Sequence, residues 1–263
     1  MATPATPIAP PLPADLEAAL KRLKLRRVRQ IAPEILQVAK TQRWPPDELL
    51  RTLVEAEIAA RDDANLRNRL RAAGFPVTKT LDEFQLAASS VPPATFDYLA
   101  SLEWLPAADN VVLVGPPGTG KSHLLIALGH AAVHAGHRVR YLTAADLVER
   151  LFAGLADNTV GRVIDTLLRH TLIIIDELGF APLDATGTQL LFRFIAAAYE
   201  RRALGIASHH PFDQWGRFLP EHTTAAALLD RLLHHAVVVT TDGDSFRMKE
   251  ARTRATTTHS RRS

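Results

Sequence analysis

One octapeptide, Gly115-Pro116-Pro117-Gly118-Thr119-Gly120-Lys121-Ser122, fits the phosphate-loop pattern GxxxxGK[S/T] at every fixed position. It follows the apolar run 111–114 directly and precedes a helical stretch, which is the strand-loop-helix context that the pattern requires. Glycines let backbone N–H groups close around phosphates, the lysine bridges β and γ oxygens, and the serine hydroxyl can bind Mg2+. The sequence therefore predicts a binding site for a nucleoside triphosphate, with Lys121 and Ser122 in those two roles.

From residue 111 onward, apolar runs alternate with helical stretches, a pattern typical of a parallel sheet covered by helices on both faces. The expected strands are 111–114, 138–143, 172–176, 204–208 and 236–240, and the expected helices are 121–134, 144–155, 159–169, 187–201 and 223–234. We predict an α/β fold of the phosphate-loop NTPase type. The 23 residues after position 240 are too few for a sizeable C-terminal helical lid.

The region before this fold has the pattern of a small all-helical domain. We expect Asp15 to cap its first helix, Pro33 to open the second and Pro45-Pro46-Asp47 to start the third. The predicted divisions are a leader (1–13), a helical domain for DNA or partner binding (14–76), a connector (77–110), the nucleotide-binding core (111–246) and a basic tail (247–263). Since the leader lacks the features of a signal peptide and no apolar run approaches the roughly 18 residues of a membrane span, we expect a cytoplasmic protein without membrane contact.

Charge is segregated along the chain. Lys and Arg outnumber Asp and Glu by 14 to 9 in residues 1–80 and by 6 to 1 in residues 247–263. In residues 81–246, Asp and Glu outnumber Lys and Arg by 18 to 11. Six basic residues fall within nine positions of the N-terminal region: Lys21, Arg22, Lys24, Arg26, Arg27 and Arg29. Such a density fits contact with a polyanion such as nucleic acid, although a solvated helix face would have the same composition. The absence of cysteine excludes disulfides and thiolate zinc sites.

Two acids end a second buried strand, about 50 residues beyond the phosphate loop. The strand 172–175 is followed by Asp176 and Glu177. Ligands of parallel sheets sit beyond the carboxyl ends of the strands, so Asp176 can face a Mg2+ ion held by Ser122. Glu177 is placed to polarise an attacking water as a general base, which favours hydrolysis over transfer to a small molecule.

Polar side chains at the end of the fourth strand are candidates for sensing the γ-phosphate. Ser208 and His209 occupy that position, and a plain strand-to-loop turn is the alternative interpretation. The adjacent pair His234-His235 lacks metal-site spacing because neighbouring residues do not share a helix face. Arg231, in the helix before the last strand, could project into the nucleotide site of another subunit, or could form an ion pair with Asp230 or Glu221 instead.

Several segments together resemble the IstB-like transposition helper ATPases, which belong to the AAA+ superfamily and are relatives of the DnaC-type helicase loaders. The matching segments are Lys79-Thr80-Leu81-Asp82-Glu83-Phe84, NVVLVGPPGTGKSHLLIALG, LIIIDELGF, Trp215-Gly216-Arg217-Phe218-Leu219-Pro220, LLDRLLHHA and Ser245-Phe246-Arg247-Met248-Lys249-Glu250-Ala251. The phosphate loop and the acidic strand mark AAA+ ATPases broadly, and the C-terminal segments are more specific to the helper.

The resemblance implies an ATPase that assembles as a homo-oligomer on duplex DNA and works with a transposase encoded by the same element, promoting target choice and insertion. By position, Lys121, Ser122 and Asp176 would hold ATP and Mg2+, Glu177 would activate water, and Arg231 would be an arginine finger. The resemblance also places Phe84 near the adenine and makes Arg247 a weak candidate for a second sensor.

Two predictions keep an alternative, namely which residue senses the γ-phosphate and what the N-terminal helices bind. Relatives often carry Asn at the sensor position that aligns with His209. Both Ser208 and His209 are therefore candidates for the residue that senses the γ-phosphate. The second function considered is a DnaC-type helicase loader, in which the N-terminal helices would dock a replicative helicase rather than DNA.

Overall fold

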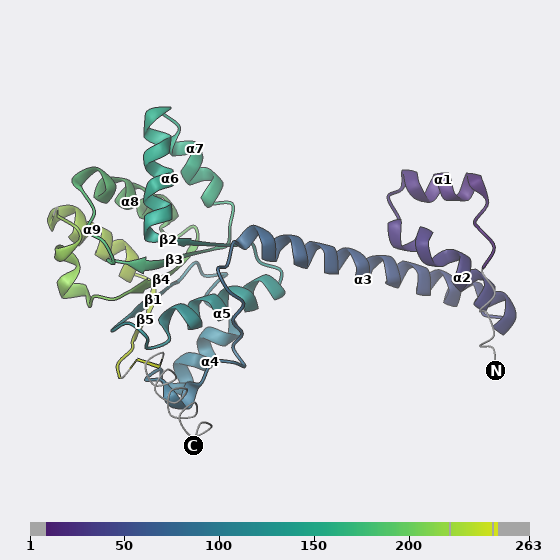
Figure 1. Ribbon diagram of the computed structural model, residues 1–263, viewed down its shortest axis with the longest axis horizontal. Helices are drawn as coiled ribbons and strands as arrows, with labels where there is room; N and C mark the ends of the chain where they lie inside the picture. The colour runs from purple at the N-terminus through teal and green to yellow at the C-terminus, as the bar shows by residue number, and fades with distance from the viewer. Residues whose placement is uncertain (1–8, 221, 244, 247–263) are drawn as a thin grey trace, which may run out of the picture. The chain divides into compact units, whose positions relative to one another are not determined.

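The computed structural model describes residues 9–220, 222–243 and 245–246, and the chain divides into two compact units, Met1–Asn68 and Arg69–Ser263 (Figure 1). The functional division proposed from the sequence stays a prediction. Within the described residues, no helix is both long and apolar enough to cross a bilayer.

The first unit consists of α1 (Ala14–Arg22), α2 (Arg26–Gln42) and the adjoining part of α3 (Pro46–Ala73). The expectation that Asp15 caps the first helix is wrong, because Pro13 occupies the cap position and Asp15 lies in the first turn. The expectation that Pro33 opens a helix is also wrong, because Pro33 lies inside α2. α3 starts at Pro46, within the predicted start at Pro45-Pro46-Asp47.

A buried carboxylate explains why α2 begins ahead of its proline. Glu57 of α3 accepts hydrogen bonds from the backbone N–H groups of Arg27 (2.7 Å) and Val28 (3.1 Å), and Arg61 Nε donates to it at 2.9 Å. Burial alone would raise the pKa of Glu57, but these hydrogen bonds and the charge of Arg61 lower it. Glu57 therefore satisfies first-turn N–H groups of α2 that have no partner within the helix.

The second unit is a parallel sheet of five strands in the order β2-β3-β4-β1-β5, with helices on both faces (Figure 1). Its strands are β1 (Asn110–Val114), β2 (Val139–Thr143), β3 (Leu172–Leu178), β4 (Ala203–Ser208) and β5 (Ala236–Thr240). Its helices are the end of α3, η1 (Leu86–Ala88), α4 (Pro93–Ser101), α5 (Lys121–His134), α6 (Ala144–Ala156), α7 (Val160–Leu167), α8 (Ala185–Ala198), η2 (Phe212–Arg217) and α9 (His222–Leu233). The predicted α/β fold is confirmed, with strand bounds within two residues of those expected.

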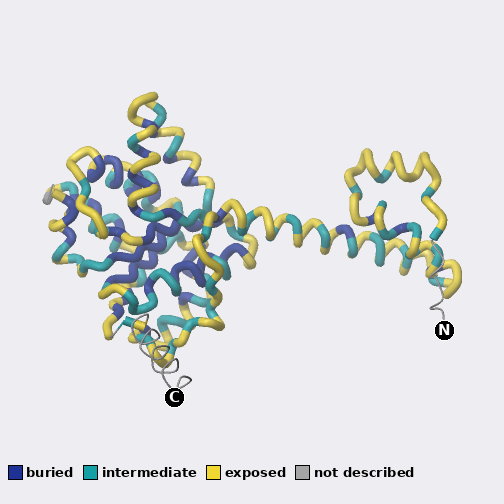
Figure 2. Tube along the Cα trace, viewed as in Figure 1, coloured by how far each residue is buried: buried dark blue, intermediate teal, exposed yellow. Residues whose placement is uncertain are grey.

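The sheet is the most deeply buried part of this unit (Figure 2). Every residue of β1 and β4 is buried, as their nearly continuous apolar sequences predict. One face packs against α6, α7, α8 and α9 to form the main apolar core, and α5 covers the other face (Figure 1). Because all strands are parallel, the loops after β1, β3 and β4 leave from one edge of the sheet, where the candidate site lies.

Candidate nucleotide site

The phosphate loop joins the end of β1 to the start of α5. Its three glycines, Gly115, Gly118 and Gly120, all have positive φ angles of 145°, 83° and 93°, a region that other residues rarely adopt. The Lys121 ammonium donates to the carbonyl oxygens of Gly115 and Pro116, each at 2.6 Å. The first N–H groups of α5 lack partners within the helix, so this loop and helix end together form a site suited to phosphate.

The two predicted metal ligands lie side by side. Ser122 Oγ donates to Asp176 Oδ1 at 3.0 Å, although the two residues are 54 positions apart. Asp176 is buried, with 3 % of its surface exposed. Hydroxyl and carboxylate oxygens are the hard donors that Mg2+ prefers, so this pair fits the ion.

Glu177 lies in a β-bulge at the end of β3. Ile175 pairs with Ile206 across the β3–β4 ladder. The next pair is Leu178 with Ser208, so β3 carries one residue more than β4 over this interval. Glu177 accommodates the extra residue by a positive φ of 60°, and its side chain is exposed to solvent. The bulge therefore buries the Asp176 carboxylate while leaving that of Glu177 accessible to water.

Tyr141 is a site residue that the sequence analysis missed. Its hydroxyl donates to Asp176 Oδ2 at 2.9 Å from the edge strand β2. Burial, followed by the charge and hydrogen bond of Asp176, raises the pKa of Tyr141, which keeps the hydroxyl protonated as a donor. The available signal was a tyrosine in the strand that pairs with the acidic strand.

The structure separates the two sensor candidates. Ser208 is fully buried, and its hydroxyl exchanges hydrogen bonds with the N–H and C=O of His210, both at 3.2 Å. Among the described residues, His209 has a buried Nδ1 without a hydrogen-bond partner. Burial, and then the positive charge of Lys121, lower the pKa of His209, so its ring is neutral near pH 7. The surroundings of His209 therefore suit a sensor better than those of Ser208.

The segment after β5 packs on the phosphate loop, a contact that the sequence did not predict. Thr241 Oγ1 lies 2.7 Å from Thr119 Oγ1, and the Phe246 N–H donates to the Gly118 carbonyl at 3.0 Å. Arg247, the weak candidate for a second sensor, falls outside the described residues. The end of the described chain thus helps to shape the loop.

Phe84 lies against the other end of the loop. A Cβ atom added at Gly120 would come within 3.1 Å of the Phe84 ring. The same ring stacks on Phe96, with centroids 5.6 Å apart, and meets His123 edge-on at 5.4 Å. The stacked rings of Phe84 and Phe96 therefore lie beside the phosphate loop at Gly120.

Comparison with protein families gives the context for this geometry. The model of the IstB-like ATP binding protein family matches residues 18–254. The chain belongs to the IstB-like ATP-binding proteins. The ATP-binding protein of insertion sequence IS21 from Pseudomonas aeruginosa is 34 % identical over 239 residues, covering 90 % of each chain. That of insertion sequence IS5376 from Geobacillus stearothermophilus is 32 % identical over 232 residues, covering 88 % of this chain and 92 % of the relative.

Solved structures share the fold of this IstB-like protein. AMPPCP-bound DnaA from Aquifex aeolicus has a TM-score of 0.53 at 22 % identity, covering 66 % of this chain and 54 % of DnaA. DnaI has a TM-score of 0.51 at 18 % identity, covering 67 % and 94 %. Family membership together with the phosphate-loop fold makes the chain an ATP-binding ATPase.

Arg231 lies at the opposite edge of the sheet from the phosphate loop of its own chain. Its Nη1 donates to the Ala227 carbonyl at 2.9 Å, and its guanidinium lies 5.1 Å from the Phe192 ring centroid. The next residue of α9, Leu232, accepts a hydrogen bond from the side chain of Asn110, the first residue of β1. The backbone of this turn of α9 therefore lies at the end of β1 remote from the loop, and β1 is roughly 16 Å long at 3.3 Å per residue.

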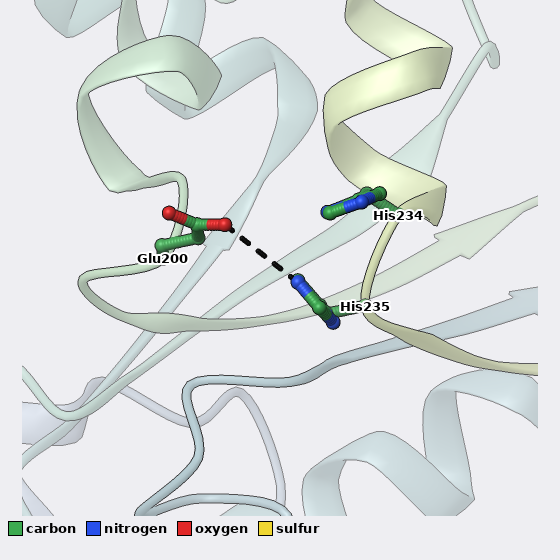
Figure 3. A group of neighbouring side chains, drawn as sticks. All are labelled: Glu200, His234 and His235. Atoms are coloured by element: carbon green, nitrogen blue, oxygen red, sulfur yellow. Dashed lines mark ion pairs between the residues drawn. The ribbon is translucent and has the colours of Figure 1, made fainter.

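A cluster near Arg231 links the α8–β4 and α9–β5 turns (Figure 3). His235 Nε2 lies 3.6 Å from Glu200 Oε1, and His234 Nδ1 lies 2.8 Å from the Tyr199 hydroxyl. One potential ligand atom from each of Glu200, His234 and His235 lies within 4.8 Å of the others. The helix-face argument used for these two histidines does not apply, because α9 ends at Leu233. All three side chains are exposed, and one nitrogen of each imidazole already lies close to another side chain.

The six predicted DNA contacts lie around the turn between α1 and α2 in the first unit. Lys21 and Arg22 end α1, Lys24 lies in the turn with φ of 57°, and the other three lie in the first turns of α2. All are exposed except Arg29, which is half-buried. The Arg61 guanidinium donates to the Lys24 carbonyl at 3.2 Å and thereby holds the turn from α3.

Proposed function

We propose that this ATPase assembles on duplex DNA and serves as helper of the transposase encoded by the same element, promoting target selection and insertion. The observation that carries the proposal is that an IstB-like ATP site and an exposed turn with six basic residues occur in separate units of one chain. Backbone phosphates would pair with such a turn without regard to base sequence.

In the proposed reaction, each residue of the site has a separate role. Lys121 binds the β and γ phosphates, and Ser122 and Asp176 would hold a Mg2+ ion, which would supply positive charge to the phosphates. Glu177 removes a proton from the attacking water, and His209 contacts the γ-phosphate or that water through its ring nitrogen. Phe84 packs against the adenine.

ATP hydrolysis measured with and without long duplex DNA tests the proposal. We expect duplex to stimulate hydrolysis by the wild-type chain, and Lys121→Ala to abolish it. Replacing the six basic residues of the α1–α2 turn by Gln should remove the stimulation and weaken duplex binding. The slope of log affinity against log salt should become shallower by about 0.9 for each DNA phosphate that the variant no longer neutralises.

The first unit offers a matched control for this test. Leu50, Val54 and Ile58 are exposed on α3 at helical spacing, and replacing them by Ser changes no charge. This control should keep wild-type duplex affinity. Unchanged affinity and salt slope in the six-residue variant would rule out the basic turn as the DNA site. Hydrolysis indifferent to duplex, combined with binding of a purified replicative helicase, would favour the helicase-loader function instead.

Arg231 is proposed to act on the nucleotide of a neighbouring subunit, because it is remote from its own phosphate loop. Arg231→Ala and Glu177→Gln should each be nearly inactive, whereas a 1:1 mixture should recover up to about one quarter of wild-type hydrolysis, since one subunit supplies the base and the next supplies the finger. Arg201→Ala is the control, because Arg201 also donates to a carbonyl four residues earlier in the chain, that of Ala197 in α8. A mixture no more active than its components would contradict action between subunits.

A further inference from the structure

We propose that Tyr141 is a positioning residue for ATP hydrolysis, which fixes the orientation of the Asp176 carboxylate, and that Phe75, two residues after α3, holds the Tyr141 ring in place. The proposal rests on the metal-binding role proposed above for Asp176. It connects the helix that leaves the first unit with the catalytic edge of the sheet through named contacts within the second unit.

The hydrogen bonds of Asp176 come from two directions. Its Oδ1 accepts from Ser122 Oγ (3.0 Å) and from the Glu177 N–H (2.8 Å), whereas its Oδ2 accepts from the Tyr141 hydroxyl (2.9 Å). The terminal torsion of an aspartate is broad, so a carboxylate held at one oxygen can still rotate. Tyr141 occupies the second oxygen and leaves Oδ1 directed at Ser122.

The position of Tyr141 in the sheet allows this contact. Tyr141 pairs with Ile174, and Thr143 pairs with Asp176, across the β2–β3 ladder. Side chains two residues apart on a strand share a face, so Tyr141 lies on the face of Ile174 and Asp176, one step before the acid. The phenol ring is long enough to bring the Tyr141 hydroxyl to the Asp176 carboxylate.

The segment that follows α3 packs against this ring. The Phe75 centroid lies 6.3 Å from that of Tyr141 and 4.3 Å from that of His130, on which it stacks. A Cβ atom added at Gly129 would come within 2.7 Å of the Phe75 ring and 2.8 Å of the Ile174 side chain, so these groups leave no free space.

A hydrogen bond fixes the same segment to β2. Arg140 Nη1 donates to the Ala72 carbonyl in the last turn of α3, at 2.8 Å. Arg140 directly precedes Tyr141, so the end of α3 is tied to β2 by this bond and by the Phe75 ring. Movement of this helix end would therefore act on Tyr141 through both contacts.

The alternative is that the aromatic rings only fill space. The variant Tyr141→Phe separates the two interpretations, because it keeps the ring and removes the hydroxyl. The probe is a fluorescent, non-hydrolysable ATP analogue, whose binding to the full chain is titrated with Mg2+. Melting temperature without nucleotide reports on packing.

We expect Tyr141→Phe to raise the Mg2+ concentration for half-maximal binding by about 10- to 100-fold, the usual effect of removing a group that orients a metal ligand. Affinity for the analogue without Mg2+ and the melting temperature should stay near wild type. Phe75→Leu should shift the Mg2+ dependence in the same direction by a smaller factor. Tyr199→Phe is the control, because its hydroxyl is also hydrogen-bonded but lies at the opposite edge of the sheet.

Wild-type Mg2+ dependence in Tyr141→Phe would overturn the inference, and so would an equal loss of affinity with and without Mg2+. Asp176→Asn distinguishes this failure from that of the proposed metal role. If Asp176→Asn is strongly impaired and Tyr141→Phe is not, only the positioning role fails. If Asp176→Asn also keeps wild-type Mg2+ dependence, the metal role fails and the inference fails with it.

Discussion

Replacing Glu177 by Gln is expected to lower the kcat of ATP hydrolysis by about 100-fold or more, the usual contribution of a general base. The amide keeps the shape of the side chain but cannot accept a proton from water. Because Glu177 is exposed and lies outside the phosphate loop, ATP binding should remain within about threefold of wild type. Steady-state hydrolysis and equilibrium binding of ATP to the same preparations measure the two effects separately.

Glu149 offers a matched control for this substitution. Glu149 on α6 and Glu177 line the same hollow, together with Val148, Phe152 and Phe180. Glu149→Gln makes the same chemical change in the same surroundings and should alter kcat by less than about twofold. A Glu177→Gln variant that retained a third or more of wild-type kcat would show that another group activates the water.

The sheet and the position of its acidic strand were predictable because both depend on local patterns. Apolar runs at strand length alternate with helical periodicity, and a parallel sheet brings the ends of β1 and β3 to one edge. This geometry places Ser122 next to Asp176 without knowledge of any particular contact. The fold class and the family inferred from these motifs are confirmed.

The remaining features depend on contacts between distant residues. Tyr141 reads as an ordinary strand residue until β2 is placed beside β3. The bulge at Glu177 appears only in the pairing of β3 with β4. Pro33 was expected to start a helix because proline favours first turns, but Glu57 on α3 supplies partners for an earlier start.

The sequence could not decide between Ser208 and His209 as the sensor, because the decision depends on their hydrogen bonds in the folded chain. Both side chains are polar, and both follow the apolar part of β4. Only the structure reveals that the Ser208 hydroxyl is engaged by its own turn, whereas His209 Nδ1 is buried without a hydrogen-bond partner among the described residues.

Gly115→Ala is expected to disrupt the nucleotide site and to destabilise the second unit. A Cβ atom at Gly115 would collide with the Thr241 carbonyl oxygen and would lie 2.5 Å from Thr241 Oγ1. The loop cannot move away easily, since the Gly115 N–H donates to the Ser208 carbonyl and the Thr241 N–H donates to the Val114 carbonyl. The φ of 145° adds backbone strain, so the free energy of unfolding should fall by about 3 kcal/mol.

Gly243 separates the steric effect from the backbone effect. It also has a positive φ, 107°, but an added Cβ there would meet nothing within 4 Å. Gly243→Ala should therefore keep ATP affinity, whereas Gly115→Ala should lose at least about tenfold, because a shift of Thr241 displaces the loop that carries Thr119. Thermal unfolding should show a fall of roughly 6–12 °C for Gly115→Ala. A Gly115→Ala protein with wild-type ATP affinity and melting temperature would mean that the contact of Thr241 with the phosphate loop does not determine the shape of that loop.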